Sequence, residues 1–293
     1  MNSGKYVFSQ LLQFINRYEF EKCVARYDGN HRTRGLNCWN QFIQLFFGQL
    51  TSRNSLRDIC TCLKAHKNKL YHLGIKQFVN QSTLSRANEN RDWRIFADFG
   101  AYLIQLVKPL YENQPISNVD IENDVLALDS TTISLSLKLF TWAKGKYSRG
   151  AVKVHTLLDL RGNIPTYILI TDGRYHDNNV LDVMPIQPDA IYVMDKAYVD
   201  FAALYNIHNA GAFFITRAKV TLDCSVVDQN FNIDEGTGLR SDKTITLNGI
   251  KSKKLYPENL TGLLNTMMMR RILISHFYPI TLKRLPLKSH GYT

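Results

Sequence analysis

Apolar residues recur at helical spacing through the first 110 residues of the chain. The pattern runs through Phe8, Leu11, Leu12 and Ile15, then Trp39, Phe42, Ile43, Phe46 and Phe47, and then Phe96, Phe99, Leu103 and Ile104. Steps of three and four residues place such side chains on one face of an α-helix. The pattern therefore predicts a mainly helical region over residues 1–113, with Ser55 and Ser82 as helix N-caps.

Beyond the polar stretch Asn113–Asn118, which is typical of a linker, the apolar period changes to that of extended strands. Two short helices are expected over Asn178–Val183 and Val199–Asn209. Strands in succession, followed by strands that alternate with helices, predict a mixed α/β sheet covered by helices, with a domain boundary near residue 115. The predicted strands are Val125–Ser130, Ile133–Phe140, Val152–Leu158, Pro165–Thr171, Ile191–Asp195 and Ala212–Thr216.

The composition of the 293-residue chain is that of a folded protein with a basic surface, because 45% of its residues are hydrophobic and its net charge is +11. Residues 1–120 hold 16 Lys and Arg against nine Asp and Glu, whereas residues 121–293 hold 20 against 16. Basic side chains displace the counterions that condense on phosphates, so the excess favours a nucleic acid partner. We expect the helical region to bind DNA.

No apolar run is long enough to span a membrane, and the first residues lack the pattern of a signal peptide, so we expect a cytoplasmic protein. The five cysteines are an odd number and do not indicate a disulfide framework. Cys60-Thr61-Cys62 lacks both the spacing and the second pair that a zinc site needs.

Two aspartates stand directly after short apolar stretches. Asp129 follows Val125–Leu128, and Asp195 follows Ala190–Met194. A carboxylate at the end of a buried strand is costly to desolvate unless it is paired or binds a metal ion. Two such carboxylates at one edge of a sheet suit divalent-metal phosphoryl transfer on nucleic acid. The alternative is that each aspartate only caps the turn that follows it.

Several basic or small polar positions are candidates for contact with DNA. The segment Gln81–Asn88 has the character of a recognition helix, because small polar residues open a short helix that exposes Ser85 and Arg86. The basic run Lys64–Lys69 is a further candidate, and a solvated surface is the alternative in every case. The candidates for DNA binding are Arg32, Arg34, Ser85, Arg86, Lys153, Lys196 and Arg217.

Four motifs in series resemble the DDE transposases of the insertion-sequence-4 family. They are Asp129–Thr132, Val152–Asp159, Ile170–Asp177 and Asp195–Asp200. The resemblance covers about residues 1–260, because the helical region is similar to an N-terminal domain of unknown function that precedes the catalytic core in a subgroup of these enzymes.

This resemblance implies an RNase H-like core over residues 120–260. Asp129 on the first strand and Asp195 on the fourth would be its catalytic residues and would hold two Mg²⁺ ions, with Mn²⁺ as the alternative metal. All-oxygen coordination suits such hard cations. The resemblance also implies cleavage and strand transfer of double-stranded DNA at the terminal inverted repeats of a transposon, carried out by a homodimer on the two ends.

The chain departs from the family pattern after about residue 220. The family's third acid is a glutamate within a signature of Tyr, Arg, Glu and Lys on a late helix, and the sequence contains no such arrangement. Residues from about 220 resemble the β-rich insertion that precedes that helix, whereas Asn259–Thr293 contains no acidic residue. We therefore expect residues 261–293 to be an aberrant, poorly ordered tail left by a frameshift or truncation, and this copy to be defective. Glu258 is the competing third ligand, although Pro257 beside it argues against a helix there.

Two other functions stay open at this point. A chain without the third ligand would act as a non-catalytic DNA-binding remnant, which retains the basic helical region and loses cleavage. A haloacid-type phosphatase draws on the same aspartates, but it needs Asp-x-Asp at its first strand, and Ala127–Thr131 offers one Asp. Metal-dependent nicking of DNA separates the first of these from a transposase.

Overall fold

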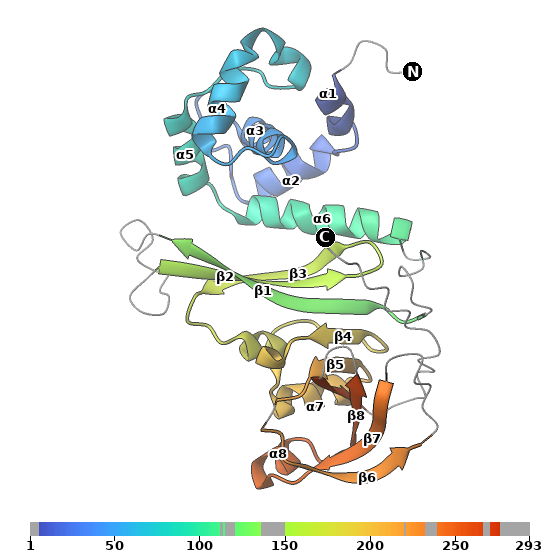
Figure 1. Cartoon of the computed structure of the whole chain (residues 1–293). Coiled ribbons are helices and arrows are strands. Elements are labelled where there is room, and N and C mark those ends of the chain that lie inside the picture. The colour runs from blue at the N-terminus through green and yellow to red at the C-terminus, as the bar shows by residue number, and fades with distance from the viewer. Residues whose placement is uncertain are drawn as a thin grey trace, which may run out of the picture. The chain divides into compact units, whose positions relative to one another are not determined.

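The chain forms two compact units, Met1–Leu106 and Val107–Thr293 (Figure 1). The computed structural model describes residues 6–111, 114, 121–135, 150–219, 221–231, 239–265 and 270–275, and for 239–240, 261–265 and 270–275 it describes the backbone only. The sequence places the domain boundary near residue 115, and helix α6 (Arg94–Tyr111) runs across the observed division.

The first unit is helical, as the apolar spacing predicts. Ser55 is an N-cap, because its side chain accepts a hydrogen bond from the Asp58 amide. The N-cap prediction for Ser82 is wrong, because that helix already begins at Gln81. The described elements before α6 are α1 (Val7–Leu12), α2 (Arg17–Arg26), α3 (Cys38–Leu50), α4 (Leu56–Ala65), η1 (Lys67–Lys69), η2 (Tyr71–Leu73) and α5 (Gln81–Asn90).

An aromatic cluster holds α2, α3 and α6 together. Phe20 on α2 is fully buried, and its ring lies 5.1 Å from that of Phe99 and 5.4 Å from that of Trp39. Phe42 also packs against Phe20, with 5.2 Å between the ring centroids. Aromatic pairs at such separations add to the stabilisation from apolar burial. The helical spacing in the sequence includes Trp39, Phe42 and Phe99 of this cluster, but it does not include Phe20.

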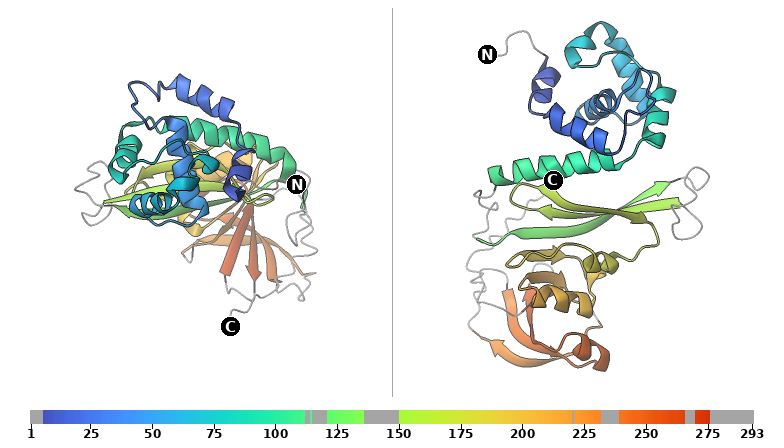
Figure 2. Two further views of the ribbon diagram at one scale, coloured as in Figure 1. Left: turned by 90° about the horizontal axis from the view of Figure 1, so that it is seen from above. Right: turned by 180° about the vertical axis from the view of Figure 1, so that it is seen from behind.

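The second unit is built on one strongly twisted sheet. Its described strands have the order β3-β2-β1-β4-β5-β9-β8-β7-β6, and β7 and β8 run steeply across the direction of β1–β3 (Figure 2). The strands are β1 (Val125–Leu135), β2 (Gly150–Asp159), β3 (Ile164–Asp172), β4 (Ile191–Met194), β5 (Phe213–Arg217), β6 (Cys224–Asn230), β7 (Leu239–Leu247), β8 (Leu260–Asn265) and β9 (Arg270–Ser275). The helical segments are η4 (Asp177–Asp182), η5 (Lys196–Tyr198), α7 (Phe201–Asn209) and α8 (Ile250–Leu255).

Strands β1–β5 form an RNase H-like core. β1, β2 and β3 are antiparallel neighbours, while β4 and β5 continue the sheet parallel to β1. The mixed α/β fold expected from the sequence is confirmed. Of the predicted strand Ile133–Phe140, residues 133–135 extend β1, and residues 136–140 lie outside the described residues.

The strands of this core alternate their side chains between two faces. Leu126, Tyr192 and Phe214 belong to the main core, against which α7 packs Leu204 and Ile207. The main core therefore lies between the sheet and α7, and it positions the strand ends that carry the candidate carboxylates. A smaller apolar cluster occupies the other face of the strands and contains Val125, Ile191, Val193, Phe213 and Ile215.

Two parts of the segment 261–293, for which the sequence predicts poor order, are strands in the structure. Residues 261–265 continue β8, and β9 pairs with both β8 and β5. The remaining residues of that segment lie outside the described residues. Among the helices that the structure describes, none is long and apolar enough to cross a membrane. All five cysteines are free.

Candidate active site

Asp129 and Asp195 stand at neighbouring positions of the sheet. The parallel pairing of β1 with β4 ends at Leu128 and Met194, and each aspartate is the next residue of its chain. Adjacent strands are about 4.8 Å apart. The register therefore brings the backbones of the two aspartates side by side, at the edge to which the sequence assigns them.

Both aspartates also belong to the same face of the sheet. Residues alternate between faces along a strand, so Asp129 follows Val125, and Asp195 follows Ile191 and Val193, on the face of the smaller apolar cluster. Asp129 is exposed and Asp195 is half-buried. Two carboxylates on one face, in adjacent register positions, form a candidate site for a divalent cation.

Arg217 on β5 extends this row of charged residues. The β4–β5 pairing ends at Met194 and Thr216, which makes Arg217 the neighbour of Asp195. The Arg217 Nε donates a hydrogen bond of 2.7 Å to Asp195 Oδ1, and the Lys196 amide donates to the same oxygen. Partial burial acts to raise the pKa of Asp195, but these two hydrogen bonds outweigh it and hold that pKa below its ordinary value.

Replacing Arg217 by glutamine is expected to tighten Mn²⁺ binding by about twofold to fivefold, because Arg217 occupies an oxygen of Asp195 and repels a cation. This range corresponds to the roughly 0.5–1 kcal/mol of an exposed, solvent-screened ion pair. Side-chain exposures of 34% for Arg217 and 40% for Asp195 justify that small value. Isothermal titration with Mn²⁺ measures the effect, and Lys254→Gln on α8 removes one charge elsewhere as the control. Weaker binding by the Arg217 variant would show instead that Arg217 orders Asp195 for the metal.

A second polar cluster lies on the opposite face of β1, around Asp177. The sequence suggests a helix cap at this position, but the structure places Asp177 in the first turn of η4, with its carboxylate turned toward the sheet. Asp177 Oδ1 accepts hydrogen bonds of 3.0 Å from both Ser130 Oγ and Lys153 Nζ. Asp177 thus ties η4 and β2 to the residue directly after Asp129.

His155 and Tyr198 complete the buried part of this cluster. His155 is fully buried, its Nε2 lies 3.2 Å from Thr171 Oγ1, and burial lowers its pKa, so the ring is neutral near pH 7. Burial also raises the pKa of Tyr198 to about 12, and the carboxylates of Asp177, Asp129 and Asp195 add to that effect. The nearby Ser130 hydroxyl acts to lower the pKa of Tyr198, although it forms no hydrogen bond with the phenol. The buried phenol of Tyr198 is therefore protonated near pH 7.

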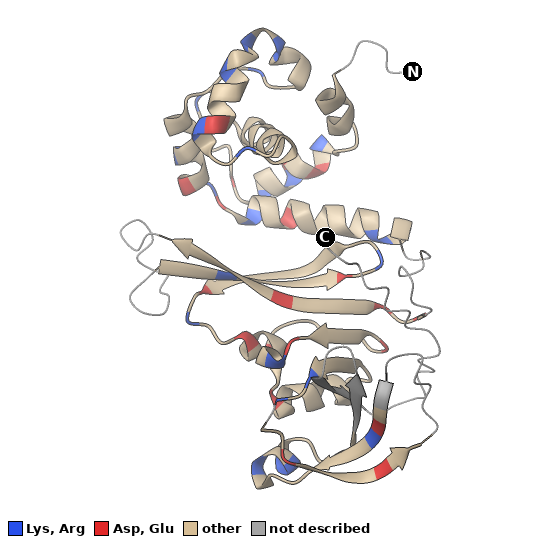
Figure 3. Ribbon diagram, viewed as in Figure 1, with Lys and Arg blue, Asp and Glu red and all other residues tan. Residues whose placement is uncertain are grey.

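The remaining predicted residues fall into two groups. Lys153 and Arg217, expected to contact DNA, form ion pairs with Asp177 and Asp195. Lys196 is exposed beside Asp195. The other candidates, Arg32, Arg34, Ser85 and Arg86, are exposed in the helical unit, where basic positions are visible on α4, α5 and the loops beside them (Figure 3).

Asp129 and Asp195 fit a hard divalent cation, because they supply carboxylate oxygens from adjacent strand ends. Among the residues that the structure describes, no group of three or more His, Cys, Asp or Glu is arranged to hold a metal ion. Glu258, the competing third ligand, follows α8 and lies in no helix. The described part of the chain thus offers a two-carboxylate site.

Comparison with known proteins identifies two domains. Residues 3–76 match a domain of unknown function, DUF4372, and residues 121–263 match a transposase DDE domain. A protein of Sinorhizobium fredii named "Putative transposase y4zB" is 31% identical over 180 residues, which are 60% of this chain and 48% of that protein. The chain therefore spans about half the length of this relative.

Two solved structures show weaker likenesses. The piggyBac transposase in a synaptic complex with hairpin DNA has a TM-score of 0.44 and 10% identity, over 95% of this chain and 63% of that one. Endonuclease V from Streptomyces avermitilis has a TM-score of 0.26 and 13% identity, over 59% of this chain and 75% of that one. The chain thus combines a DUF4372 domain with a region that matches a transposase DDE domain.

Proposed function

We propose that the sheet unit cleaves and joins DNA during transposition, with Asp129 and Asp195 as its catalytic residues. One observation carries this proposal: the two aspartates directly follow the last paired residues of adjacent parallel strands, on one face of the sheet. Nothing in the packing of the core requires carboxylates there. Their oxygens suit Mg²⁺, and Mn²⁺ as the alternative metal.

Each neighbouring residue has a distinct part in this proposal. Asp129 and Asp195 would hold the metal ions, which supply activation of the attacking water or 3'-hydroxyl and stabilisation of the leaving oxygen. Arg217 pairs with Asp195 in the absence of the metal and helps to keep it ionised. Lys196 is exposed next to Asp195 and is placed to contact a DNA phosphate. Asp177 fixes β1 beside Asp129 through Ser130.

The DNA partner follows from the same proposal. We infer that the substrate is double-stranded transposon DNA with terminal inverted repeats, bound in the cytoplasm and held at two ends by a homodimer. Arg32, Arg34, Ser85 and Arg86 are proposed as contacts in the helical unit. Lys153, Lys196 and Arg217 are proposed as contacts in the sheet unit. The basic balance of residues 1–120 supports the assignment, since phosphate contacts supply most of the affinity for DNA.

The two-carboxylate site favours a second candidate function. The 293 residues contain no counterpart of the family's late-helix glutamate, and we propose that a chain limited to them is defective in cleavage. Loss of a residue that hydrogen-bonds to a metal ligand typically lowers affinity or activity by about 10- to 100-fold. The absence of a residue that binds the metal directly should matter at least as much. A non-catalytic DNA-binding remnant is then the alternative to a slow transposase.

Nicking of a supercoiled plasmid that carries the transposon ends tests the proposal. We expect slow nicking in Mg²⁺ or Mn²⁺ and none in EDTA, because the reaction needs the metal held by the two aspartates. Gel electrophoresis separates nicked from supercoiled plasmid, and a gel-shift assay in EDTA follows DNA binding in parallel. Equal inertness of the wild type and Asp129→Asn, with binding retained in both, would establish the remnant instead.

A further inference from the structure

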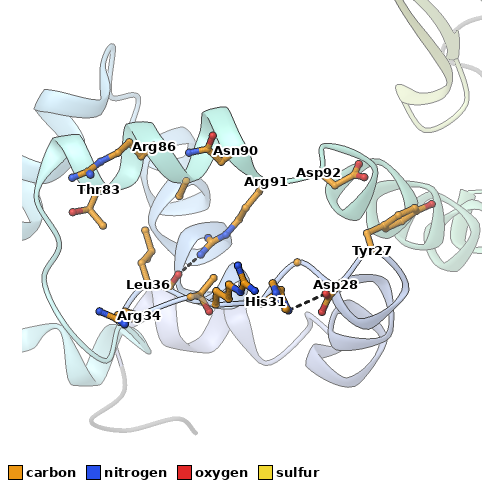
Figure 4. A pocket seen from close by; sticks show the side chains of 14 residues that line it. Tyr27, Asp28, His31, Arg34, Leu36, Thr83, Arg86, Asn90, Arg91 and Asp92 are labelled. Carbon is orange, nitrogen blue, oxygen red and sulfur yellow. Dashed lines mark hydrogen bonds and ion pairs between the residues drawn. The ribbon is translucent and has the colours of Figure 1, made fainter.

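Helix α5 and the loop between α2 and α3 enclose a pocket of about 570 Å³ within the helical unit (Figure 4). The loop adopts left-handed backbone conformations at Asp28 and Arg32, with φ of 48° and 49°. We call this cavity the arginine pocket. Its lining includes Asp28, His31, Arg32, Thr33, Arg34, Leu36, Thr83, Arg86, Asn90, Arg91 and Asp92.

Positive charge gathers in the arginine pocket without a matching set of carboxylates. Arg32, Arg34 and Arg86 are exposed, and none of them has a carboxylate partner among the described residues. The lining also holds two acids: Asp28 Oδ2 lies 3.3 Å from Nδ1 of His31, which belongs to the same lining, and Asp92 pairs with Arg94 outside it. Like charges in one pocket repel each other, and an anion relieves that repulsion.

Arg91 adds a fourth guanidinium at the base of the pocket. It is half-buried and donates hydrogen bonds to Gln41 Oε1 and to the Leu36 carbonyl, both of which are neutral acceptors. Burial lowers its pKa, and no carboxylate offsets that effect. Figure 4 shows Arg91 reaching from the end of α5 to Leu36, with Arg86 and Thr83 on one side and Arg34 and His31 on the other. The hydrogen bonds tie α5 to the segment before α3 and keep an uncompensated charge in the pocket.

We propose that the arginine pocket binds backbone phosphates of duplex DNA. Arg32, Arg34 and Arg86 provide direct contacts at its rim, and Arg91 provides fixed charge behind them. Guanidinium groups suit this task because they present several donors in a planar fork that matches phosphate oxygens. The hydroxyl of Thr83 and the amide of Asn90 are further polar groups of the same lining. The identity of the polymer rests on the proposed function, whereas the requirement for an anion rests on the pocket itself.

Binding of a fluorescein-labelled duplex by the full-length chain, measured by anisotropy in EDTA, tests this inference separately from cleavage. We expect the variant Arg32→Gln/Arg34→Gln/Arg86→Gln to bind at least about tenfold more weakly at moderate salt. For this variant, the slope of log affinity against log salt concentration should be smaller in magnitude by about 0.9 for each phosphate contact removed. Because all three positions are exposed, the variant should keep the wild-type circular dichroism spectrum and thermal midpoint.

Lys251→Gln/Lys253→Gln/Lys254→Gln is the matched control, because it removes the same charge from exposed positions of α8 in the sheet unit. It should retain most of the affinity and of the salt dependence. An equal loss in both triple variants would reduce the effect to net charge and overturn the arginine pocket. Unchanged binding by the arginine variant, or no binding of duplex DNA by the wild type, would overturn it as well. A wild type that binds through the pocket but never nicks DNA would count only against the proposed cleavage.

Discussion

Asp129→Asn and Asp195→Asn are each expected to abolish metal-dependent nicking and to weaken Mn²⁺ binding by at least about 100-fold. Asparagine keeps the size of the side chain and one oxygen but removes the negative charge that attracts the cation. Loss of a residue that hydrogen-bonds to a metal ligand typically lowers metal affinity or activity by about 10- to 100-fold. Loss of a ligand itself should lower them by at least as much. The neighbouring positions at the ends of β1 and β4 make the two aspartates one unit.

The combination of both substitutions should be no worse than either one alone, because groups that act together lose their function together. Isothermal titration with Mn²⁺ and the plasmid assay report the two effects independently. Asp200→Asn is the matched control: Asp200 caps α7 by accepting hydrogen bonds from the Ala202 and Ala203 amides, and asparagine caps a helix about equally well. Full Mn²⁺ affinity in either active-site variant would remove that aspartate from the metal site.

The core of the sheet unit could be predicted from the sequence because its signals are local. Short apolar runs in a sequence predict buried strands. The runs before Asp129 and Asp195 lie in β1 and β4 of the structure. Asp200 stands in the sequence at the start of a predicted helix, a position that favours an N-cap, and it caps α7. One sequence does not show which residues of two strands pair with each other. Because both carboxylates stand at strand ends, the simplest hypothesis is that the two strands are adjacent.

The Asp177 cluster could not be predicted in the same way. Its members come from β1, β2 and η4, and their spacing along the chain has no period that brings them together. Asp177 precedes the polar and apolar residues of a short helical segment, which is also the pattern of a cap. The sequence proposes Lys153 and Arg217 as DNA contacts on their charge alone, and only the tertiary structure reveals that each also pairs with a carboxylate.

The resemblance implies a β-rich region from about residue 220, but the sequence gives neither the bounds of β6–β9 nor the arginine pocket. β6 is largely exposed, and polar and apolar residues alternate only weakly along it. Its sequence therefore does not predict a strand, and its extended conformation depends on pairing with β7. Arg34 and Arg86 were identified as separate candidates, some 50 residues apart in the chain. Their convergence depends on the loop after α2 and on Arg91, whose role no local pattern indicates.

Asp177→Ala is expected to destabilise the sheet unit by about 2–4 kcal/mol, because it leaves Lys153 without its carboxylate partner. The side chain of Lys153 is only 14% exposed and that of Asp177 24%, so water compensates little of the loss. Lys153 would keep its hydrogen bond to the Tyr175 carbonyl, which is a neutral acceptor. Hydrogen exchange of the β1 and β2 amides measures this stability separately from that of the helical unit.

Two further variants distinguish a lost ion pair from a general disturbance of η4. Asp182→Ala, at the exposed end of the same segment, should change the stability by no more than about 0.5 kcal/mol. Asp177→Ala/Lys153→Met should be less destabilised than Asp177→Ala, because methionine removes the unpaired charge while it keeps most of the apolar stem. If the double variant is instead the less stable of the two, the unpaired charge of Lys153 is not the main cost of Asp177→Ala, and the hydrogen bond of Lys153 to the Tyr175 carbonyl outweighs it.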